Sequence, residues 1–324
     1  DADGNTVTGS SAVVTVAAVE TGATLATTLT ATASSGVATF SGLKLTGTVG
    51  NYTLRYTATG LTRVDDTISL TYGAADHLTI STSSAGFTNR VAFTTQPTII
   101  VQDANNNTVY NSTVSISATA SAGNGAVLSG GTAVAASSGS LTFSALKLTG
   151  KVGDYTITYA ATGLTSATET VTLLPGSATQ LVQTTNAAGF TNRVAFTTQP
   201  VVKIEDADGN VVTGSSASVS VAASAGNGAV LTGNATPVTA SSGVATFSGL
   251  TMTGLVGDYT LTFTSTGLSN ATQNFTLLPG AANKLAMKTS AAGAVNGVAF
   301  TTQPQINVLD ADGNVVTGSS ASIA

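Results

Sequence analysis

The chain repeats itself with a period of about one hundred residues. The pentapeptide Asp-Ala-Asp-Gly-Asn stands at 1–5, 206–210 and 310–314, and a variant, Asp-Ala-Asn-Asn-Asn, stands at 103–107. Successive copies therefore begin 102, 103 and 104 residues apart. A solenoid repeat spans only about 20–45 residues, whereas about 100 residues is the size of a whole domain. The sequence predicts tandem domains of about 103 residues.

Proline-glycine pairs divide the chain into these domains. Pro175-Gly176 and Pro279-Gly280 fall between periodic segments, where such pairs mark turns or linkers. We predict the C-terminal part of a repeat, two whole repeats and the N-terminal part of another, over 1–73, 74–176, 177–280 and 281–324. The chain is interpreted as a window of a longer array. The alternative is that its incomplete ends complete one another between molecules by strand exchange.

Alternation of apolar and polar residues indicates strands. In residues 259–264, Tyr, Leu and Phe alternate with Thr, as expected of a half-buried antiparallel strand. The same pattern and the turn residues predict strands over 180–185, 194–198, 201–205, 216–222, 229–232, 243–252, 258–266 and 270–278. Seven or eight short strands in about 100 residues are typical of a β-sandwich. We therefore predict an all-β fold of tandem immunoglobulin-like β-sandwich domains arranged as a rod.

Composition excludes several functions. The chain has no Cys and a single His, His77, which excludes thiol catalysis, disulfides, cysteine zinc sites and His-dependent triads. Its 10 basic and 15 acidic residues form no basic stripe, so no nucleic-acid partner is expected. No apolar run is long enough to span a membrane. With 60 Thr and 34 Ser and no catalytic motif, a non-enzymatic protein is predicted.

One aromatic position has a specific structural interpretation. The tripeptide Gly257-Asp258-Tyr259 stands at the start of a long predicted strand. It resembles the tyrosine corner of immunoglobulin-like sandwiches, in which the hydroxyl group bonds to nearby backbone. The alternative is an ordinary core aromatic residue, and both interpretations are structural.

Several motifs together resemble a known family. Val-Ala-Phe-Thr-Thr-Gln-Pro at 194–200, Asp-Ala-Asp-Gly-Asn at 206–210, Ser-Gly-Val-Ala-Thr-Phe-Ser-Gly-Leu at 242–250 and Gly-Asp-Tyr-Thr-Leu-Thr-Phe at 257–263 follow one another in that order. This pattern resembles the bacterial immunoglobulin-like (Big, invasin-like) tandem repeats of large extracellular surface and adhesin proteins. The resemblance covers nearly the whole chain. It implies a spacer or adhesive stalk at the cell surface and no shared catalytic residues.

The repeated pentapeptide was also considered as a calcium site. Asp206, Asp208 and Asn210 place oxygen atoms at alternate positions, as at the start of an EF-hand loop. However, Gly209 stands fourth rather than sixth, and the twelfth position is Ala217 rather than Glu. We expect a hairpin turn without a cofactor; calcium at Asp206, Asp208 and Asn210 is the alternative.

The function expected from these observations is that of a structural stalk or spacer in a large extracellular, microbial, adhesin-like protein. Its partners would be neighbouring repeats of the same chain and, in a filament or bundle, identical chains; no ligand is predicted. One alternative is a self-assembling surface filament or sheath subunit, joined by strand exchange. Another is a carbohydrate-binding module, which would need exposed aromatic side chains, although the chain has no Trp and only 5% aromatic residues.

Overall fold

The computed structural model describes the chain except for residues 122, 225, 234–235, 321 and 323–324. The named secondary-structure elements of the described residues are all β-strands, which confirms the all-β prediction. The described residues contain no helix that could cross a membrane. The chain divides into two compact units, residues 1–149 with 153–173 and residues 150–152 with 174–324.

The described residues of the first unit form fifteen strands, all paired antiparallel in their sheets. They are β1 (Val13–Ala18), β2 (Ala23–Ala26), β3 (Thr30–Thr32), β4 (Lys44–Gly47), β5 (Gly50–Thr57), β6 (Val64–Leu70), β7 (Ala75–Thr82), β8 (Thr98–Asp103), β9 (Ser115–Ala120), β10 (Val127–Ser129), β11 (Val134–Ala135), β12 (Ser140–Thr142), β13 (Lys147–Thr149), β14 (Gly153–Ala160) and β15 (Ala167–Leu173).

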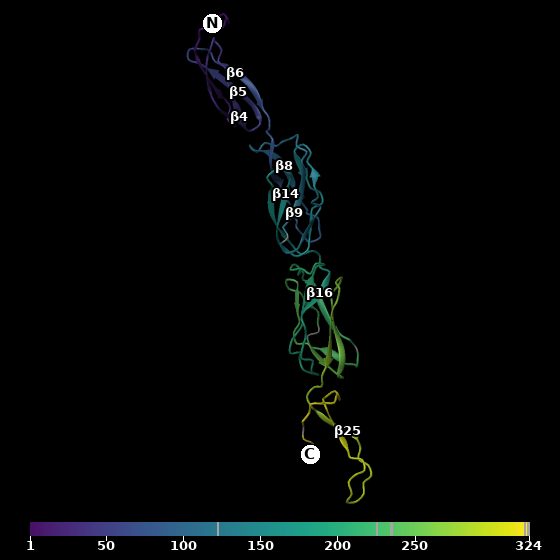
Figure 1. Cartoon of the computed structure of the whole chain (residues 1–324). Coiled ribbons are helices and arrows are strands. Elements are labelled where there is room, and N and C mark those ends of the chain that lie inside the picture. Colours follow the sequence, from purple (N-terminus) through teal and green to yellow (C-terminus); the bar gives the residue numbers. More distant parts are fainter. Residues whose placement is uncertain (122, 225, 234–235, 321, 323–324) are drawn as a thin grey trace. The chain divides into compact units, whose positions relative to one another are not determined.

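Two sheets of this unit share one core. One has the strand order β12-β8-β7 and the other β11-β9-β14-β15; β8, β9 and β14 are labelled in Figure 1. Ile99 and Val101 of β8 lie in one buried cluster with Ile157 of β14 and Val171 of β15. Because both sheets contribute their apolar faces to this cluster, the segment is a β-sandwich.

Eleven strands lie in the part of the second unit that the structure describes. They are β16 (Gln180–Thr185), β17 (Val201–Glu205), β18 (Ser218–Ala223), β19 (Val230–Thr232), β20 (Val238–Thr239), β21 (Val244–Thr246), β22 (Thr251–Thr253), β23 (Gly257–Thr264), β24 (Ala271–Leu277), β25 (Lys284–Thr289) and β26 (Gln305–Leu309).

The strand order repeats along the chain. The second unit has sheets β16-β17-β21 and β20-β18-β23-β24, which match β7-β8-β12 and β11-β9-β14-β15 of the first. The sheet β3-β1-β5-β6 has the same order again. Val202 and Ile204 of β17 share a core with Leu261 and Phe263 of β23. Tandem β-sandwiches are thus the architecture of the chain.

The predicted strand over 194–198 is wrong. Ala195 makes only an isolated bridge with Thr251. The N–H groups of Arg193 and Phe196 still donate to the carbonyls of Met252 and Leu250. The side chain of Gln199 interrupts the ladder, since it accepts the N–H of Leu250 and donates to the carbonyls of Phe196 and Leu250. A side chain that satisfies backbone groups in this way removes the need for a regular ladder.

The single strand predicted over 243–252 is wrong as well. It is divided into β21 and β22 by a turn at Gly249, whose φ is +69°. β21 pairs with β17 and β22 pairs with β19, so the chain changes sheet at this point. The two-residue strand β20 was not predicted.

Candidate functional site: the Asp–Asn turns

The copies of the repeated pentapeptide at 103–107, 206–210 and 310–314 each form a tight turn at the end of a strand. The N–H of the first residue donates to the carbonyl of the fifth, at 2.9 Å in each copy. The fourth residue has a left-handed backbone, with φ of +64° at Asn106, +71° at Gly209 and +90° at Gly313. Asn and Gly tolerate this conformation better than other residues. These segments, called the Asp–Asn turns below, confirm the predicted hairpin turn.

A buried carboxylate organises each turn. The side chain of Asp310 accepts bonds from the backbone N–H of Asp312 at 3.0 Å and of Asn314 at 2.9 Å. The side-chain amide of Asn314 donates to both oxygens of Asp310. Asp310 is 1% exposed and Asn314 is 4% exposed. A charged group is tolerated in such a buried position only because its oxygens are hydrogen-bonded.

The turn at 310–314 also binds backbone of the preceding repeat. The N–H of Gly280, at the Pro-Gly boundary, donates to Asp310 Oδ2 at 2.9 Å. The amide of Asn314 donates to the carbonyl of Gly254 and accepts the N–H of Val256, both at 2.9 Å. Residues 254–256 connect β22 to β23 and are called the upstream loop. One Asn side chain thus fixes the upstream loop at two points.

The same three bonds recur at the other turns. In the first unit, Asp103 accepts from Gly73, and Asn107 binds Gly47 and Val49. In the second unit, Asp206 accepts from Gly176, and Asn210 binds Gly150 and Val152. Their lengths lie between 2.7 and 3.0 Å. Residues 47–49 and 150–152 are the upstream loops of these two turns. The bonds of each Asn side chain to its upstream loop join residues 58 and 60 positions apart in the sequence.

A tyrosine supports the upstream loop from inside at 254–256 and at 47–49. Tyr259 is 2% exposed, and its hydroxyl donates to the carbonyl of Leu255 at 2.7 Å. Tyr52 donates in the same way to Thr48. The carbonyl of Leu255 and the N–H of Val256 belong to one peptide group. Tyr259 and Asn314 therefore bind the two polar groups of the same peptide. The prediction that Tyr259 bonds nearby backbone from a core position is confirmed.

The environment of the buried carboxylates changes their acidity. Burial alone disfavours the charged form of Asp103, but the N–H of Gly73 and the side chain and backbone of Asn107 outweigh it and lower the pKa to about 2. At Asp310 burial is likewise opposed by bonds from Asn314 and Gly280, and an additional bond from Asn192 lowers the pKa of Asp310 as well.

The calcium candidates Asp206, Asp208 and Asn210 lie in one of these turns. Both oxygens of Asp206 accept hydrogen bonds, from the N–H groups of Asp208 and Asn210 and from Gly176. The ammonium group of Lys151 donates to the backbone carbonyl of Asp208. Donors therefore occupy oxygens that a calcium ion would require. In the part of the chain that the structure describes, no group of three or more His, Cys, Asp or Glu side chains could hold a metal. A turn without a cofactor stays the prediction, and calcium stays its alternative.

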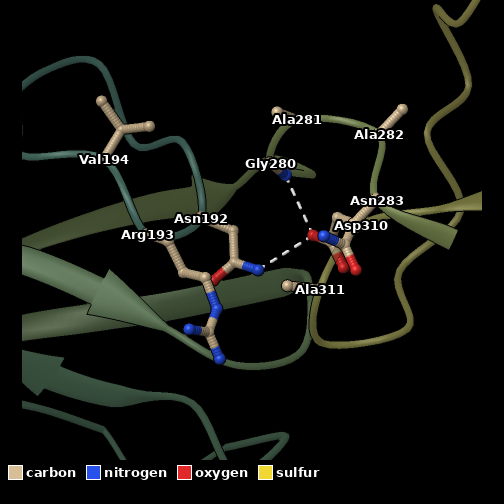
Figure 2. Close-up of a pocket in the computed structure, with 9 residues that line it drawn as sticks. All are labelled: Asn192, Arg193, Val194, Gly280, Ala281, Ala282, Asn283, Asp310 and Ala311. Carbon is tan, nitrogen blue, oxygen red and sulfur yellow. Dashed lines mark hydrogen bonds between the residues drawn. The ribbon is translucent and has the colours of Figure 1, made fainter.

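Two further residues at the turn were not found from the sequence. Figure 2 shows the side chain of Asn192 pointing toward Asp310, which also accepts from Gly280. Asn192 donates to Asp310 at 2.9 Å and to Asp312 at 2.7 Å, and Arg193 forms a two-bond ion pair with Asp312. Asn192, Arg193, Asp310 and residues 280–283 line part of a hollow of about 240 Å³. The available signal was the Asn-Arg pair at 89–90 and 192–193.

No protein-family model and no curated protein sequence matches this chain. Among solved structures, 150 chains match. The Escherichia coli adhesin FdeC is 18% identical with a TM-score of 0.37, over 87% of this chain and 90% of that one. Domains 1–6 of the surface layer protein SbsC are 14% identical with a TM-score of 0.29, over 82% and 36%. A beta-glycosidase from Bacteroides vulgatus is 14% identical with a TM-score of 0.25, over 63% and 25%. At these values the likeness carries no function to this chain.

Proposed function

We propose that this chain is a non-enzymatic stalk or spacer of an extracellular, microbial, adhesin-like surface protein, built from immunoglobulin-like domains with boundaries near residues 73, 176 and 280. The observation that carries the proposal is the recurrence of the same three hydrogen bonds at the Asp–Asn turns. These bonds join the Asp–Asn turn of one repeat to the upstream loop and the last residue of the repeat before it. A repeated contact of this kind holds neighbouring domains at a fixed separation, as a spacer requires.

The placement of the bonds supports a mechanical role. The amide of Asn107 binds one donor and one acceptor of the upstream loop, so any displacement of that loop breaks at least one bond. The acceptor carboxylate, Asp103, is 2% exposed, which protects its bonds from competition by water. The Asp–Asn turn and the upstream loop that it binds are called the joint below. The joint resists rotation more than a flexible linker of the same length would.

Distance measurements across a joint test this proposal. The chain has no Cys, so spin labels attach only to cysteines introduced at the exposed residues Thr67 and Thr170. Electron–electron resonance is expected to give a narrow distance distribution, which broadens in Asn107→Ala and not in the matched surface variant Asn111→Ala. A broad distribution in the parent, or no effect of Asn107→Ala, contradicts a rigid joint. Antibody labelling of intact cells tests the surface location.

A second candidate is a filament or sheath subunit joined by strand exchange. Phe300 is 42% exposed although its counterpart Phe196 is 3% exposed, and Leu285 is 56% exposed although Leu181 is 4% exposed. Strands from a second copy would cover these side chains. Native mass spectrometry that shows polymers growing with concentration supports this candidate, and monomers at every concentration contradict it.

A further inference from the structure

Arg193 has a left-handed backbone conformation, which is strained for a residue that carries a side chain. Its φ is +63°, in the left-handed region that Gly adopts without strain. Arg90 has a φ of +66°, and Gly297, which follows Asn296 as Arg193 follows Asn192, has a φ of +78°. The loop is therefore left-handed in each of these copies, and Gly is the unstrained residue for it. An arginine at this position needs a compensating interaction.

The compensating interaction lies in the next repeat. Arg193 Nε lies 2.6 Å from Asp312 Oδ2, and Arg193 Nη2 lies 2.7 Å from Asp312 Oδ1. The Asp312 side chain is only 16% exposed. Asn192 adds a third bond to the same carboxylate, at 2.7 Å. Asp312 is the third residue of its Asp–Asn turn, and two side chains of the preceding repeat bind it.

We propose that Arg193 selects the repeat that follows it by binding an acidic third residue of the Asp–Asn turn. A planar guanidinium matches the two oxygens of a carboxylate, whereas an Asn side chain offers only one acceptor. The turn at 103–107 has Asn105 at this position, and the loop with Gly297 has no guanidinium. The turns thus fall into a carboxylate class and an amide class. This inference rests on the joint described under the proposed function and adds a rule for which repeats fit together.

Amide hydrogen exchange in the full chain tests the rule. The variants are Arg193→Gly, Asp312→Asn and the double variant, and the readout is protection of the Val256 N–H, which Asn314 binds. Each single variant is expected to lower this protection about two- to fivefold, and the double variant no further, because both remove one interaction. High salt should reduce protection in the parent and not in the variants. The Val49 N–H is the internal control and should not change.

Two further variants separate the alternatives. Arg193→Lys keeps the charge and loses the two-bond geometry, so its protection should lie between those of the parent and Arg193→Gly. Asn314→Ala removes the joint itself. If Asn314→Ala lowers protection and Arg193→Gly does not, the selection rule is wrong and the joint stands. If neither lowers it, the proposed joint is wrong. Additive losses in the double variant also contradict the rule.

Discussion

The Asp–Asn turns at 103–107 and 310–314 share a fold and differ in what surrounds them. Both place a buried Asp and Asn against an upstream loop through the same three bonds. The third residue is Asn105 in the first and Asp312 in the second, and the side chains of Asn192 and Arg193 bind Asp312. The first and fifth residues therefore form the joint, and the third residue modifies it. The predictions that follow test this division, from the largest effect to the smallest.

The largest effect is expected from the tyrosine beneath the loop. Tyr259→Ala should lower the free energy of unfolding of the second unit by about 3–5 kcal/mol, because it deletes a buried ring. Tyr259→Phe keeps the ring and should cost about 1 kcal/mol, since only the bond to Leu255 is lost. Denaturant titration of both variants measures the difference. Equal losses would mean that the hydroxyl rather than the ring carries the stability.

The buried carboxylates come next. Asp310→Ala leaves several buried N–H donors without an acceptor, so it should cost roughly 2–3 kcal/mol. Asn192→Ala removes the bonds of that side chain to Asp310 and Asp312 and should cost less, about 1 kcal/mol, because the other donors to Asp310 remain. Thermal unfolding compares the two variants, with the exposed Asp66→Ala as the control. A loss in Asn192→Ala as large as that in Asp310→Ala would contradict the central role of the carboxylate.

Acid should act on the same groups. The pKa of Asp103 is about 2 in the folded chain against an ordinary value of 3.8. A carboxyl with a lowered pKa stabilises the fold above its unfolded pKa, and this contribution is lost as the pH falls through the folded value. Unfolding free energies should therefore decline between about pH 4 and pH 2 in the parent. Asp103→Asn should flatten part of this decline, and an unchanged slope would refute the assignment.

The fourth residue of the turn should give a smaller effect. Gly313 has a φ of +90° and open space around its α-carbon. Gly313→Val should cost about 1 kcal/mol from backbone conformation alone. In the other turn Asn106 already has a side chain at φ of +64°, so Asn106→Gly should be close to neutral. Melting temperatures of the two variants check the contrast, which a large effect at Asn106 would overturn.

Chelation should have the smallest effect. The Asp206 oxygens already accept hydrogen bonds, so removing calcium should leave the melting temperature unchanged. A chelator-sensitive shift that disappears in Asp208→Ala would establish a calcium site at this turn.

The sequence predicted local features better than distant ones. The turn at 206–210 and the burial of Tyr259 follow from residue type and alternation within a few positions, and both were predicted. The contact between Asn107 and Gly47 joins residues 60 positions apart, and no local pattern specifies it. Backbone groups of Gly47 and Val49 make these bonds, so the upstream residues carry no side-chain signal.

Arg193 was missed for a different reason. An Asn-Arg pair has no distinctive meaning in a sequence. The role of Arg193 depends on its positive φ, which the backbone preferences of arginine do not predict. The break within 243–252 was missed because Gly249 was interpreted as part of a strand, whereas its left-handed backbone turns the chain into another sheet.

The middle residue of the upstream loop is Thr48 in one copy, Lys151 in another and Leu255 in the third. The Asn side chain of the next repeat forms its hydrogen bonds to this loop with main-chain atoms on either side of that residue. These bonds do not depend on the side chain of that residue. Repeats could therefore be duplicated, deleted or shuffled within a gene and still form the same bonds with their neighbours. A protein assembled in this way can vary in length while each connection keeps the same local geometry.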